Sequence, residues 1–318
     1  MAMGEFQLIQ RFFDRVPVRR AQLGIGDDCA LLEGAPAGQA MAVTTDMLVC
    51  GRHFLPSVDP ESLGHKALAV NLSDLAAMGA TPNSFTLALA LPEVDEAWLE
   101  RFARGLLNLA READCELVGG DTTRGPLNVC ITAIGRVAAT IALRRDCARP
   151  GDELWVSGEL GAAAFAVREA AAGRPLPTEH PAQRRLDWPQ PQLALGRALP
   201  GLARAAIDLS DGLAGDVGHL IERSGVGVRI DWLAVPLAAC LTDEPEAERM
   251  RLALSGGDDY ELLFSAPVEA RVAIEQLADR LDVRLTRIGT VVEGRERVIT
   301  GRHGERLGDQ LGGYDHFG

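Results

Sequence analysis

The sequence predicts an α/β (α+β) fold in two domains, and three observations support this. The chain has 318 residues, more than one hydrophobic core commonly supports. Segments with strand-like alternation and segments with helical spacing follow one another in both halves. A turn-rich connector near residues 138–150 separates the halves. We therefore expect an N-terminal domain over residues 1–138 and a C-terminal α/β domain over residues 149–318.

Composition and charge exclude several classes of protein. Hydrophobic residues make up 47% and charged residues 24% of the chain, which is typical of globular domains. The net charge of −13 argues against a nucleic-acid or anionic-membrane partner. No segment approaches the ~18 consecutive apolar residues that span a bilayer, and the first residues lack a signal-peptide pattern. Six scattered cysteines without a Cys-x-x-Cys pair indicate free thiols, so we expect a cytoplasmic protein.

Local patterns in the N-terminal half predict alternating helices and strands. An amphipathic pattern predicts a helix over residues 5–15, and Asp59-Pro60 is a typical helix start, which predicts a helix running towards Asp74. Apolar residues at helical spacing predict another helix over residues 95–113. Strands are expected over residues 41–46, 84–91, 115–118 and 127–137.

The C-terminal half has the same alternation. Strands are expected over residues 153–157, 205–207 and 260–264, with helices over residues 161–172 and from Gly212 to Ser224. The stretch over residues 173–191 is rich in proline, arginine and polar residues, so we expect an exposed loop there.

Aspartates are concentrated at the expected strand ends and in glycine-rich turns. The segments that share this property are Gly24–Asp28, Thr44–Asp46, Asn71–Asp74, Gly119–Thr122, Asp208–Gly212 and Gly256–Asp259. Any one of them alone is ordinary turn chemistry. Carboxylates that converge repel one another unless cations lie between them, and Mg²⁺ binds carboxylates together with substrate phosphates. Six such segments on separate elements therefore predict a shared metal site.

Nucleotide-binding motifs of the common kinds are missing from the sequence. It contains no P-loop, no protein-kinase glycine loop and no dinucleotide fingerprint, since Gly24-Ile25-Gly26 lacks the third glycine. Glycines beside the aspartates would let backbone N–H groups approach phosphate oxygens. If the chain binds ATP, we expect a different scaffold.

The ordered set of motifs resembles a known family. GEFQLI, GIGDDCA, TTD followed by His53-Phe54, NLSDLAAMGA, VGGDTTRGP, AIDLSDGL, SGGDDYEL and GYDHF occur in this order over essentially the whole chain. Together they resemble the thiamine-monophosphate kinase family, which belongs to the aminoimidazole ribonucleotide synthetase superfamily. The resemblance implies a two-domain ATP-binding fold and a homodimer in which the N-terminal domains pair through their sheets.

The resemblance also implies a reaction. ATP and thiamine monophosphate would give ADP and thiamine diphosphate by direct transfer of the γ-phosphoryl group to the substrate phosphate. The acceptor is already an anionic oxygen, so no catalytic base is implied, and positioning with charge neutralisation is the main task. Several Mg²⁺ ions would supply that neutralisation.

Residue roles follow from the same resemblance, position by position. The implied Mg²⁺ ligands are Asp28, Thr44, Thr45, Asp46, Asp74, Asp121, Asp208 and Asp211. The implied ATP contacts are Gly120, Asp121, Arg145 and Ser210, and the implied substrate contacts are His53, Asp258 and Tyr314. We expect the carboxylates of Asp46, Asp74 and Asp121 to lie within about 10 Å of one another, the scale of a bridged metal group.

One departure from the family pattern concerns the substrate end. The family commonly has Gly-Gly-Glu-Asp-Tyr where this chain has Gly256-Gly257-Asp258-Asp259-Tyr260. Asp258 is one methylene shorter than glutamate, so we expect a looser or water-bridged contact with the substrate.

Other functions remain open at this point. A selenophosphate synthetase would need a reactive cysteine in a lysine-containing loop, whereas Cys29 has no lysine nearby and Lys66 is the only lysine of the chain. An aminoimidazole ribonucleotide synthetase, a two-metal phosphohydrolase and a non-catalytic nucleotide-binding protein would all share the aspartates. Release of ADP that depends on thiamine monophosphate distinguishes the kinase from the last two.

Overall fold

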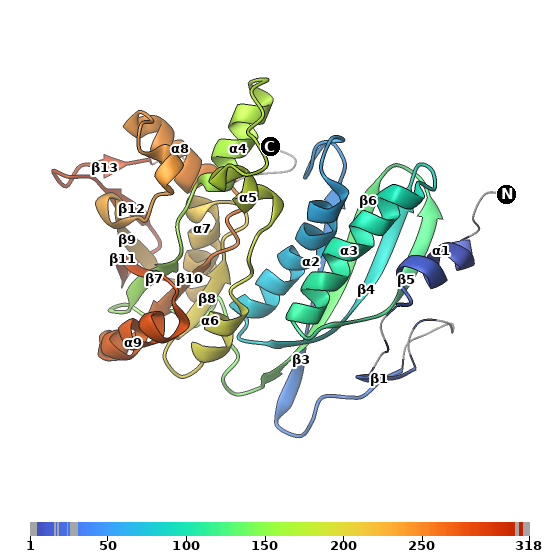
Figure 1. The fold of residues 1–318 in the computed structure, drawn as a ribbon. Helices are drawn as coiled ribbons and strands as arrows, with labels where there is room; N and C mark the ends of the chain where they lie inside the picture. The colour runs from blue at the N-terminus through green and yellow to red at the C-terminus, as the bar shows by residue number, and fades with distance from the viewer. Residues whose placement is uncertain are drawn as a thin grey trace. The chain divides into compact units, whose positions relative to one another are not determined.

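A computed structural model describes residues 5–15, 17, 19–23, 25, 31–308 and 312–313. The chain divides into two compact units (Figure 1). One contains Met1–Leu75 and Ala80–Thr140, and the other contains Ala76–Gly79 and Ile141–Gly318. The predicted mixed α/β class is confirmed.

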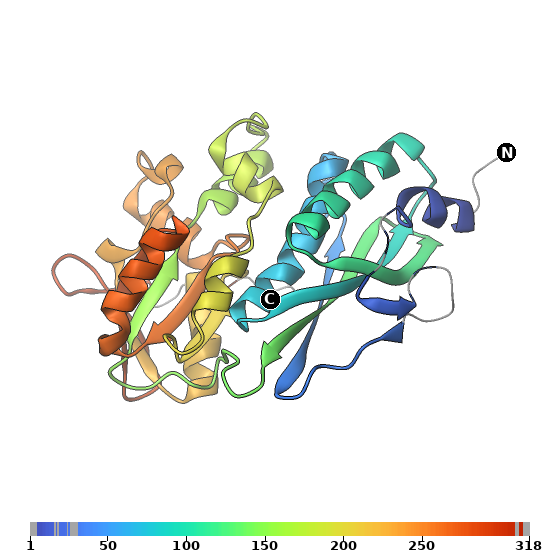
Figure 2. The ribbon, with the colours of Figure 1, turned by 60° about the horizontal axis from the view of Figure 1, so that its bottom comes forward.

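The first unit is built on a four-stranded sheet in the order β3-β6-β4-β5. Its strands are β3 (Gln39–Val49), β4 (Thr81–Leu91), β5 (Glu116–Arg124) and β6 (Asn128–Ala138). Strand β6 is antiparallel to both β3 and β4, and β4 is parallel to β5. The two long helices, α2 (Pro60–Ala77) and α3 (Glu96–Glu112), lie on the same face of this sheet (Figure 2).

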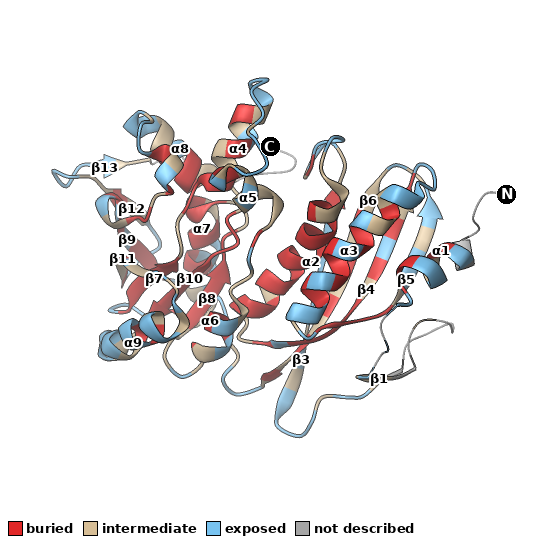
Figure 3. Ribbon diagram, viewed as in Figure 1, coloured by how far each residue is buried: buried red, intermediate tan, exposed pale blue. Residues whose placement is uncertain are grey.

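Helix starts in this unit follow the capping residues in the sequence. Asp59 accepts hydrogen bonds from the backbone N–H groups of Glu61 and Ser62, at 2.9 and 3.2 Å, directly before α2. Asp95 caps α3 in the same way through the N–H groups of Ala97 and Trp98. Buried residues colour most of α2 in Figure 3, and even Lys66 within it is only 5% exposed. The helices α2 and α3 therefore form the main cover of the sheet.

Two strands in this unit continue well beyond the C-terminal ends that the sequence patterns predict. Strand β3 continues past Asp46 to Val49, and β5 continues through Gly120 and Asp121 to Arg124. The expectation that Asp46 and Asp121 end strands is therefore wrong. Residues 47–49 pair with β6 and residues 119–124 pair with β4, so the ladder satisfies backbone groups that a turn would expose.

Smaller elements complete the N-terminal part of the chain. They are α1 (Glu5–Phe12), β1 (Ala21–Leu23) and β2 (Leu31–Leu32). Phe12 at the end of α1 is fully buried, which confirms the amphipathic pattern expected there.

The second unit is built on a seven-stranded sheet in the order β13-β12-β9-β11-β7-β10-β8. Its strands are β7 (Glu153–Ser157), β8 (Ala205–Asp208), β9 (Gly227–Asp231), β10 (Leu262–Ala266), β11 (Leu285–Val292), β12 (Arg297–Thr300) and β13 (Arg306–Leu307). The β12–β9 pair is parallel and the other pairs are antiparallel. The sheet ends at β8, which carries Asp208 as its last residue.

Helices pack on both faces of this second sheet. One buried cluster joins β7 and β8 residues such as Val156 and Ile207 to α7 (Leu213–Ser224) and α8 (Glu246–Ser255). A second cluster joins Trp155 and Phe264, on the alternate positions, to α6 (Leu193–Ala198) and α9 (Arg271–Leu281). Alternation along each strand thus sends successive side chains into two different cores. Short 3₁₀ turns lie at Trp232–Ala234, Ala239–Leu241 and Val268–Ala270.

A helical pair stands beside α8, and its second helix lies where the sequence predicts an exposed loop. Helix α4 (Ala162–Ala171) is followed by α5 (Pro181–Asp187), so the loop predicted over residues 173–191 is only partly correct. Ala182 of α5 is buried against α4 residues, which gives this segment a small core of its own.

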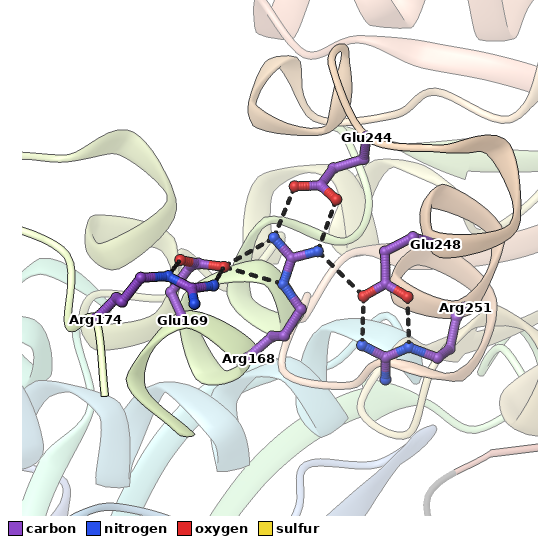
Figure 4. A network of polar contacts seen from close by, with 6 residues as sticks. All are labelled: Arg168, Glu169, Arg174, Glu244, Glu248 and Arg251. Atoms are coloured by element: carbon purple, nitrogen blue, oxygen red, sulfur yellow. Dashed lines mark hydrogen bonds and ion pairs between the residues drawn. The ribbon is translucent and has the colours of Figure 1, made fainter. Parts of the chain in front are cut away.

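A network of ion pairs connects α4 to α8 and to Glu244, which lies just before α8 (Figure 4). Arg168 of α4 binds Glu244 at 2.7 Å, Glu248 at 3.1 Å and Glu169 at 2.9 Å. Arg251 and Arg174 extend the network from either end. The three carboxylates around Arg168 are each less than one third exposed, so this network is screened less than an ordinary surface pair.

Candidate functional site

Two carboxylates of the first unit, those of Asp46 and Asp74, lie close to each other between β3 and α2. The hydroxyl of Thr44 hydrogen-bonds the carboxylate of Asp74, one turn beyond Asn71 on the helix. The backbone N–H of Asp46 donates to the side-chain oxygen of Asn71 at 3.2 Å. Alternate β3 residues thus face the helix, and the structure brings together Thr44, Asp46 and Asp74 of the predicted metal ligands.

Burial and charge repulsion make this an unfavourable place for two free carboxylates. Burial, together with the nearby charge of Asp74, raises the pKa of Asp46 to about 7. A bound divalent cation would relieve both effects, because it neutralises the charge and replaces lost water with direct coordination.

Thr45 lies on the alternate row of β3. Its hydroxyl shares a hydrogen bond of 2.9 Å with the hydroxyl of Thr132 on β6. The structure therefore does not bring the Thr45 side chain together with Asp46 and Asp74.

Gly120 and Asp121 stand on the far edge strand of the same sheet. The register connects Asp46 through Ile131 and Leu87 to Gly120, and the next row connects Met47 through Cys130 and Ala88 to Asp121. Three strand spacings separate β3 from β5, or about 14 Å between backbones. Asp121 is exposed and is not among the residues clustered around Asp46.

His53 follows β3 in a short turn. Its Nδ1 atom accepts a hydrogen bond from the backbone N–H of Val49 at 3.0 Å. In the neutral ring this contact leaves the proton on Nε2, so the ring has a defined donor side.

In the second unit, Asp208 and Asp211 lie where β8 ends and α7 begins. Asp208 is 3% exposed, and the backbone N–H of Asp211 donates to the carboxylate of Asp216 at 3.1 Å. The pKa of Asp216 is raised to about 8, chiefly by burial and then by the charges of Asp208 and Asp211, while the backbone hydrogen bond from Asp211 and the Arg145 charge oppose this rise. Arg145, itself exposed, is therefore within electrostatic reach of this group.

The segment before β10 runs beside this turn. The backbone N–H of Asp258 donates to the carbonyl of Ser210 at 2.9 Å, and that of Tyr260 donates to the carbonyl of Leu209 at 2.8 Å. The structure thus brings Ser210, Asp211 and Asp258 together, although 47 positions separate Asp258 from Asp211 in the sequence.

The predicted residues Asp28 and Tyr314 lie outside the described residues. Gly313, which directly precedes Tyr314, is described, and it adjoins Gly215 in the first turn of α7. A Cβ atom added to Gly215 would lie 2.5 Å from the Cα of Gly313 and 3.7 Å from the Cβ of Asp211. The chain therefore passes close to the Asp208–Asp211 turn directly before Tyr314.

Sequence reasoning missed Asn71, Asp216 and Tyr260 as site residues. Asn71 and Asp216 are polar residues that are almost fully buried in helices α2 and α7. A polar residue on the apolar face of a predicted helix is the signal that could have marked both.

The donor set fits Mg²⁺ without forming a complete cage. Within the described part of the chain, no group of three or more His, Cys, Asp or Glu side chains is arranged to hold an ion. Mg²⁺ commonly takes only one or two carboxylates and completes its shell with water and substrate phosphates. The pair of Asp46 and Asp74, with the Thr44 hydroxyl, matches that requirement. Separately, none of the described helices is long and apolar enough to cross a membrane.

Comparisons with known proteins agree along the whole chain. The family profiles "AIR synthase related protein, N-terminal domain" and "AIR synthase related protein, C-terminal domain" match residues 26–137 and 149–301. The thiamine-monophosphate kinase of Escherichia coli strain K12 is 47% identical, over 100% of this chain and 99% of the relative. That of Haemophilus influenzae is 43% identical, over 92% and 90% respectively.

Solved structures give the same result. A thiamine-monophosphate kinase from Stenotrophomonas maltophilia K279a has a TM-score of 0.87 and 44% identity, covering 96% of this chain and 99% of that chain. A structure described as AaThiL complexed with AMPPCP and TMP has a TM-score of 0.78 and 31% identity, covering 99% and 97%. With this likeness over both units, the chain belongs to the thiamine-monophosphate kinase family of AIR synthase-related proteins.

Proposed function

We propose that this chain transfers the γ-phosphoryl group of ATP directly to the phosphate of thiamine monophosphate, giving ADP and thiamine diphosphate. The observation that carries the proposal is the crowding of the buried Asp46 against Asp74, a repulsion that a bound cation would relieve. Relatives that are 47% and 43% identical and named for this activity support it, as does the relative described with AMPPCP and TMP.

Magnesium and phosphate binding are assigned as the family pattern implies. Asp28, Thr44, Thr45, Asp46, Asp74, Asp121, Asp208 and Asp211 would hold several Mg²⁺ ions. When bound, these ions would neutralise charge on the transferred phosphoryl group and on both flanking phosphates. The side chain of Thr45 points to the other face of the sheet, so we assign its part in binding to backbone groups of the Thr44–Asp46 segment.

Nucleotide and substrate contacts complete the proposed site. Gly120, Asp121, Arg145 and Ser210 would contact ATP, and His53, Asp258 and Tyr314 would contact thiamine monophosphate. The task of these residues is to hold two anionic groups in line, since the attacking oxygen needs no base.

A homodimer that pairs through the N-terminal sheets belongs to the same proposal. The β3 row turned away from α2 carries exposed Met41, Val43 and Met47, which are 43%, 61% and 53% exposed. Apolar residues gathered on one sheet face are typical of an interaction surface. Because Asp121 lies at the opposite edge of the sheet from Asp46, a metal cluster with both residues would be completed by Asp121 of a second copy. A cytoplasmic location is part of the proposal, supported by the scattered cysteines.

The test is a product assay with purified protein. Thiamine monophosphate, ATP and Mg²⁺ should together give thiamine diphosphate and ADP in equal amounts, measured by chromatography. Omission of any one of the three should abolish both products. Phosphate released from thiamine monophosphate without ATP would indicate a phosphohydrolase instead, and ATP binding without turnover would indicate a binding protein.

A further inference from the structure

Every side chain in the segment from Asp258 to Glu261 takes part in a hydrogen bond. Asp259 accepts the backbone N–H of Gly161 at 2.9 Å, and Glu261 accepts the Ser157 hydroxyl at 2.5 Å. Both of these carboxylates are buried. Tyr260 lies between these two residues in the sequence, and Asp258 directly precedes them. The Tyr260 hydroxyl donates a hydrogen bond to Oδ1 of Asp258 at 2.9 Å.

Asp258 and Tyr260 both have left-handed backbone conformations. Their φ angles are +67° and +50°, in a region that bulky residues rarely adopt. Such conformations cost roughly 1–3 kcal/mol each, persist only where surrounding structure enforces them, and cluster at functional sites. Two left-handed conformations within three residues indicate that the backbone of this segment is constrained to place a particular side chain.

The surroundings that enforce this geometry belong to the Asp208–Asp211 turn. Asp258 and Tyr260 donate their backbone N–H groups to Ser210 and Leu209. At Gly257 the segment lies so close to this turn that a Cβ atom added to the glycine would be 2.1 Å from the carbonyl oxygen of Ser210. The position of Asp258 relative to the proposed ATP and metal residues is thereby fixed through the backbone.

The side chain of Asp258 is fixed by Tyr260. The tyrosine is 8% exposed, so its ring is anchored, whereas Asp258 is only half-buried. A buried donor bound to a more accessible carboxylate limits the rotation of that carboxylate. The substrate proposed above has a positively charged thiazolium ring, for which an oriented carboxylate is a complementary partner.

We propose that Tyr260 is a positioning residue, which orients the Asp258 carboxylate toward the cationic ring end of the substrate and thereby contributes to selection of thiamine monophosphate. This inference rests on the proposed function. It adds a residue that acts through Asp258 rather than by touching the substrate.

The experiment is a double-mutant cycle on the full chain with Tyr260→Phe, Asp258→Gly and the double variant. Phenylalanine keeps the buried ring and removes only the hydroxyl, and glycine adopts a φ of +67° without strain. Each protein is measured for the KM of thiamine monophosphate, the KM of ATP and kcat. Binding of thiamine monophosphate alone is measured by calorimetry, and folding by thermal melting.

Tyr260→Phe should raise the KM and the dissociation constant for thiamine monophosphate about tenfold, the scale of one hydrogen bond to a charged group. The KM of ATP and the melting temperature should stay close to those of the parent protein. In the Asp258→Gly background the same change should have no further effect, since the two residues act as one unit.

Three results would overturn the inference. One is a parent-like KM for thiamine monophosphate in Tyr260→Phe, another is an equal rise in both KM values, and the third is independent, multiplicative effects in the double variant. A parent protein that forms no thiamine diphosphate would instead refute the proposed function, so the two failures are distinguishable.

Discussion

The side-chain oxygen of Asn71 on α2 accepts a hydrogen bond from the backbone N–H of Asp46 on β3. Asn71 is fully buried, and its amide nitrogen donates to the carbonyl of Ala67 at 3.1 Å. The carboxamide therefore joins helix to strand at the point where Asp46 faces Asp74, and it sets the position of Asp46 without contributing a charge.

Replacing Asn71 by leucine should weaken metal binding while keeping a side chain of similar length. Residues that orient a metal ligand commonly contribute 10–100-fold to affinity or activity, so we expect a rise of about tenfold in the Mg²⁺ concentration for half-maximal rate. Mg²⁺ titration of the rate measures it. Asn108→Leu on the exposed side of α3 is the matched control, and an equal change in both variants would contradict the role of Asn71.

Asp46→Asn should remove most of the activity and leave the fold intact. The change keeps the volume of the side chain and removes the charge that would bind Mg²⁺, so a loss of about 100-fold or more in kcat/KM is expected. Asp243→Asn, at an exposed position, is the control and should behave like the parent protein. Retention of more than half the activity in Asp46→Asn would refute its assignment as a metal ligand.

The same variant should be more stable than the parent in the absence of metal, by an amount that grows as the pH rises from about 4 to about 7. The pKa of Asp46 is raised in the folded protein from 3.8 to about 7, so the folded state loses stability as the pH rises through that interval. Asparagine does not ionise, so the variant does not lose stability in this way. Melting temperatures in EDTA should therefore match below pH 4 and favour Asp46→Asn at pH 8; a difference that is constant with pH would contradict this.

Arg168→Ala should destabilise the second unit. Three partly buried carboxylates lose their shared cation, which we expect to cost about 1–3 kcal/mol in free energy of unfolding. Arg284→Ala removes a single pair with Glu159 that is about half exposed, and it should cost less than about 1 kcal/mol. Urea unfolding of both variants measures the difference, and equal costs would show that the network adds nothing beyond one surface pair.

This network should also affect acid stability. Hydrogen bonding to Arg251, together with hydrogen bonding to Arg168, lowers the pKa of Glu248 from 4.5 to about 2. The stability from this group is therefore complete above pH 4.5 and is lost as the pH falls towards 2. Arg168→Ala should reduce the stability difference between pH 6 and pH 2.5, as measured by urea unfolding at both pH values.

Tyr314→Ala should raise the KM for thiamine monophosphate far more than the KM for ATP. A flat aromatic face suits stacking and cation–π attraction with the thiazolium, worth roughly 0.5–2 kcal/mol. Tyr314→Trp keeps the aromatic face and should preserve function. Equal losses for both substrates would make the C-terminal segment an anchor for folding instead.

Gly215→Ala should reproduce the Tyr314→Ala phenotype. The added Cβ would meet the backbone of Gly313, so the segment that leads to Tyr314 has to move away from the Asp208–Asp211 turn. Gly218→Ala, in the same helix, meets nothing within 4 Å and is a matched control with the same gain in helix propensity. Parent-like substrate KM values in both variants would show that the close approach at Gly215 is not required.

The limits of sequence reasoning are visible in particular residues. Patterns local to one element were reliable: the Asp59-Pro60 start of α2 and the strand Glu153–Ser157 are confirmed. Asp46 and Asp121 were placed at strand ends because aspartate and glycine favour turns, yet pairing with distant strands carries both strands onward. That outcome depends on partners about 30 to 80 residues away, which no local window contains.

Site residues divide in the same way. The motif order identified Asp46, Asp74, Asp208 and Asp211, since each stands in a recognisable segment. Asn71, Asp216 and Tyr260 became visible only through their contacts with backbone groups or side chains of the site. A residue that positions another is defined by geometry between elements, and the sequence pattern of one element does not contain that geometry.

The burial of Lys66 has a practical consequence for work with this protein. It is the only lysine of the chain and is 5% exposed within α2. Amine-reactive dyes, cross-linkers and biosensor surfaces therefore find no accessible lysine side chain on the folded protein. A lysine introduced at one exposed position would be the single accessible lysine, so molecules immobilised through it would share one orientation in surface-based measurements of nucleotide and thiamine monophosphate binding.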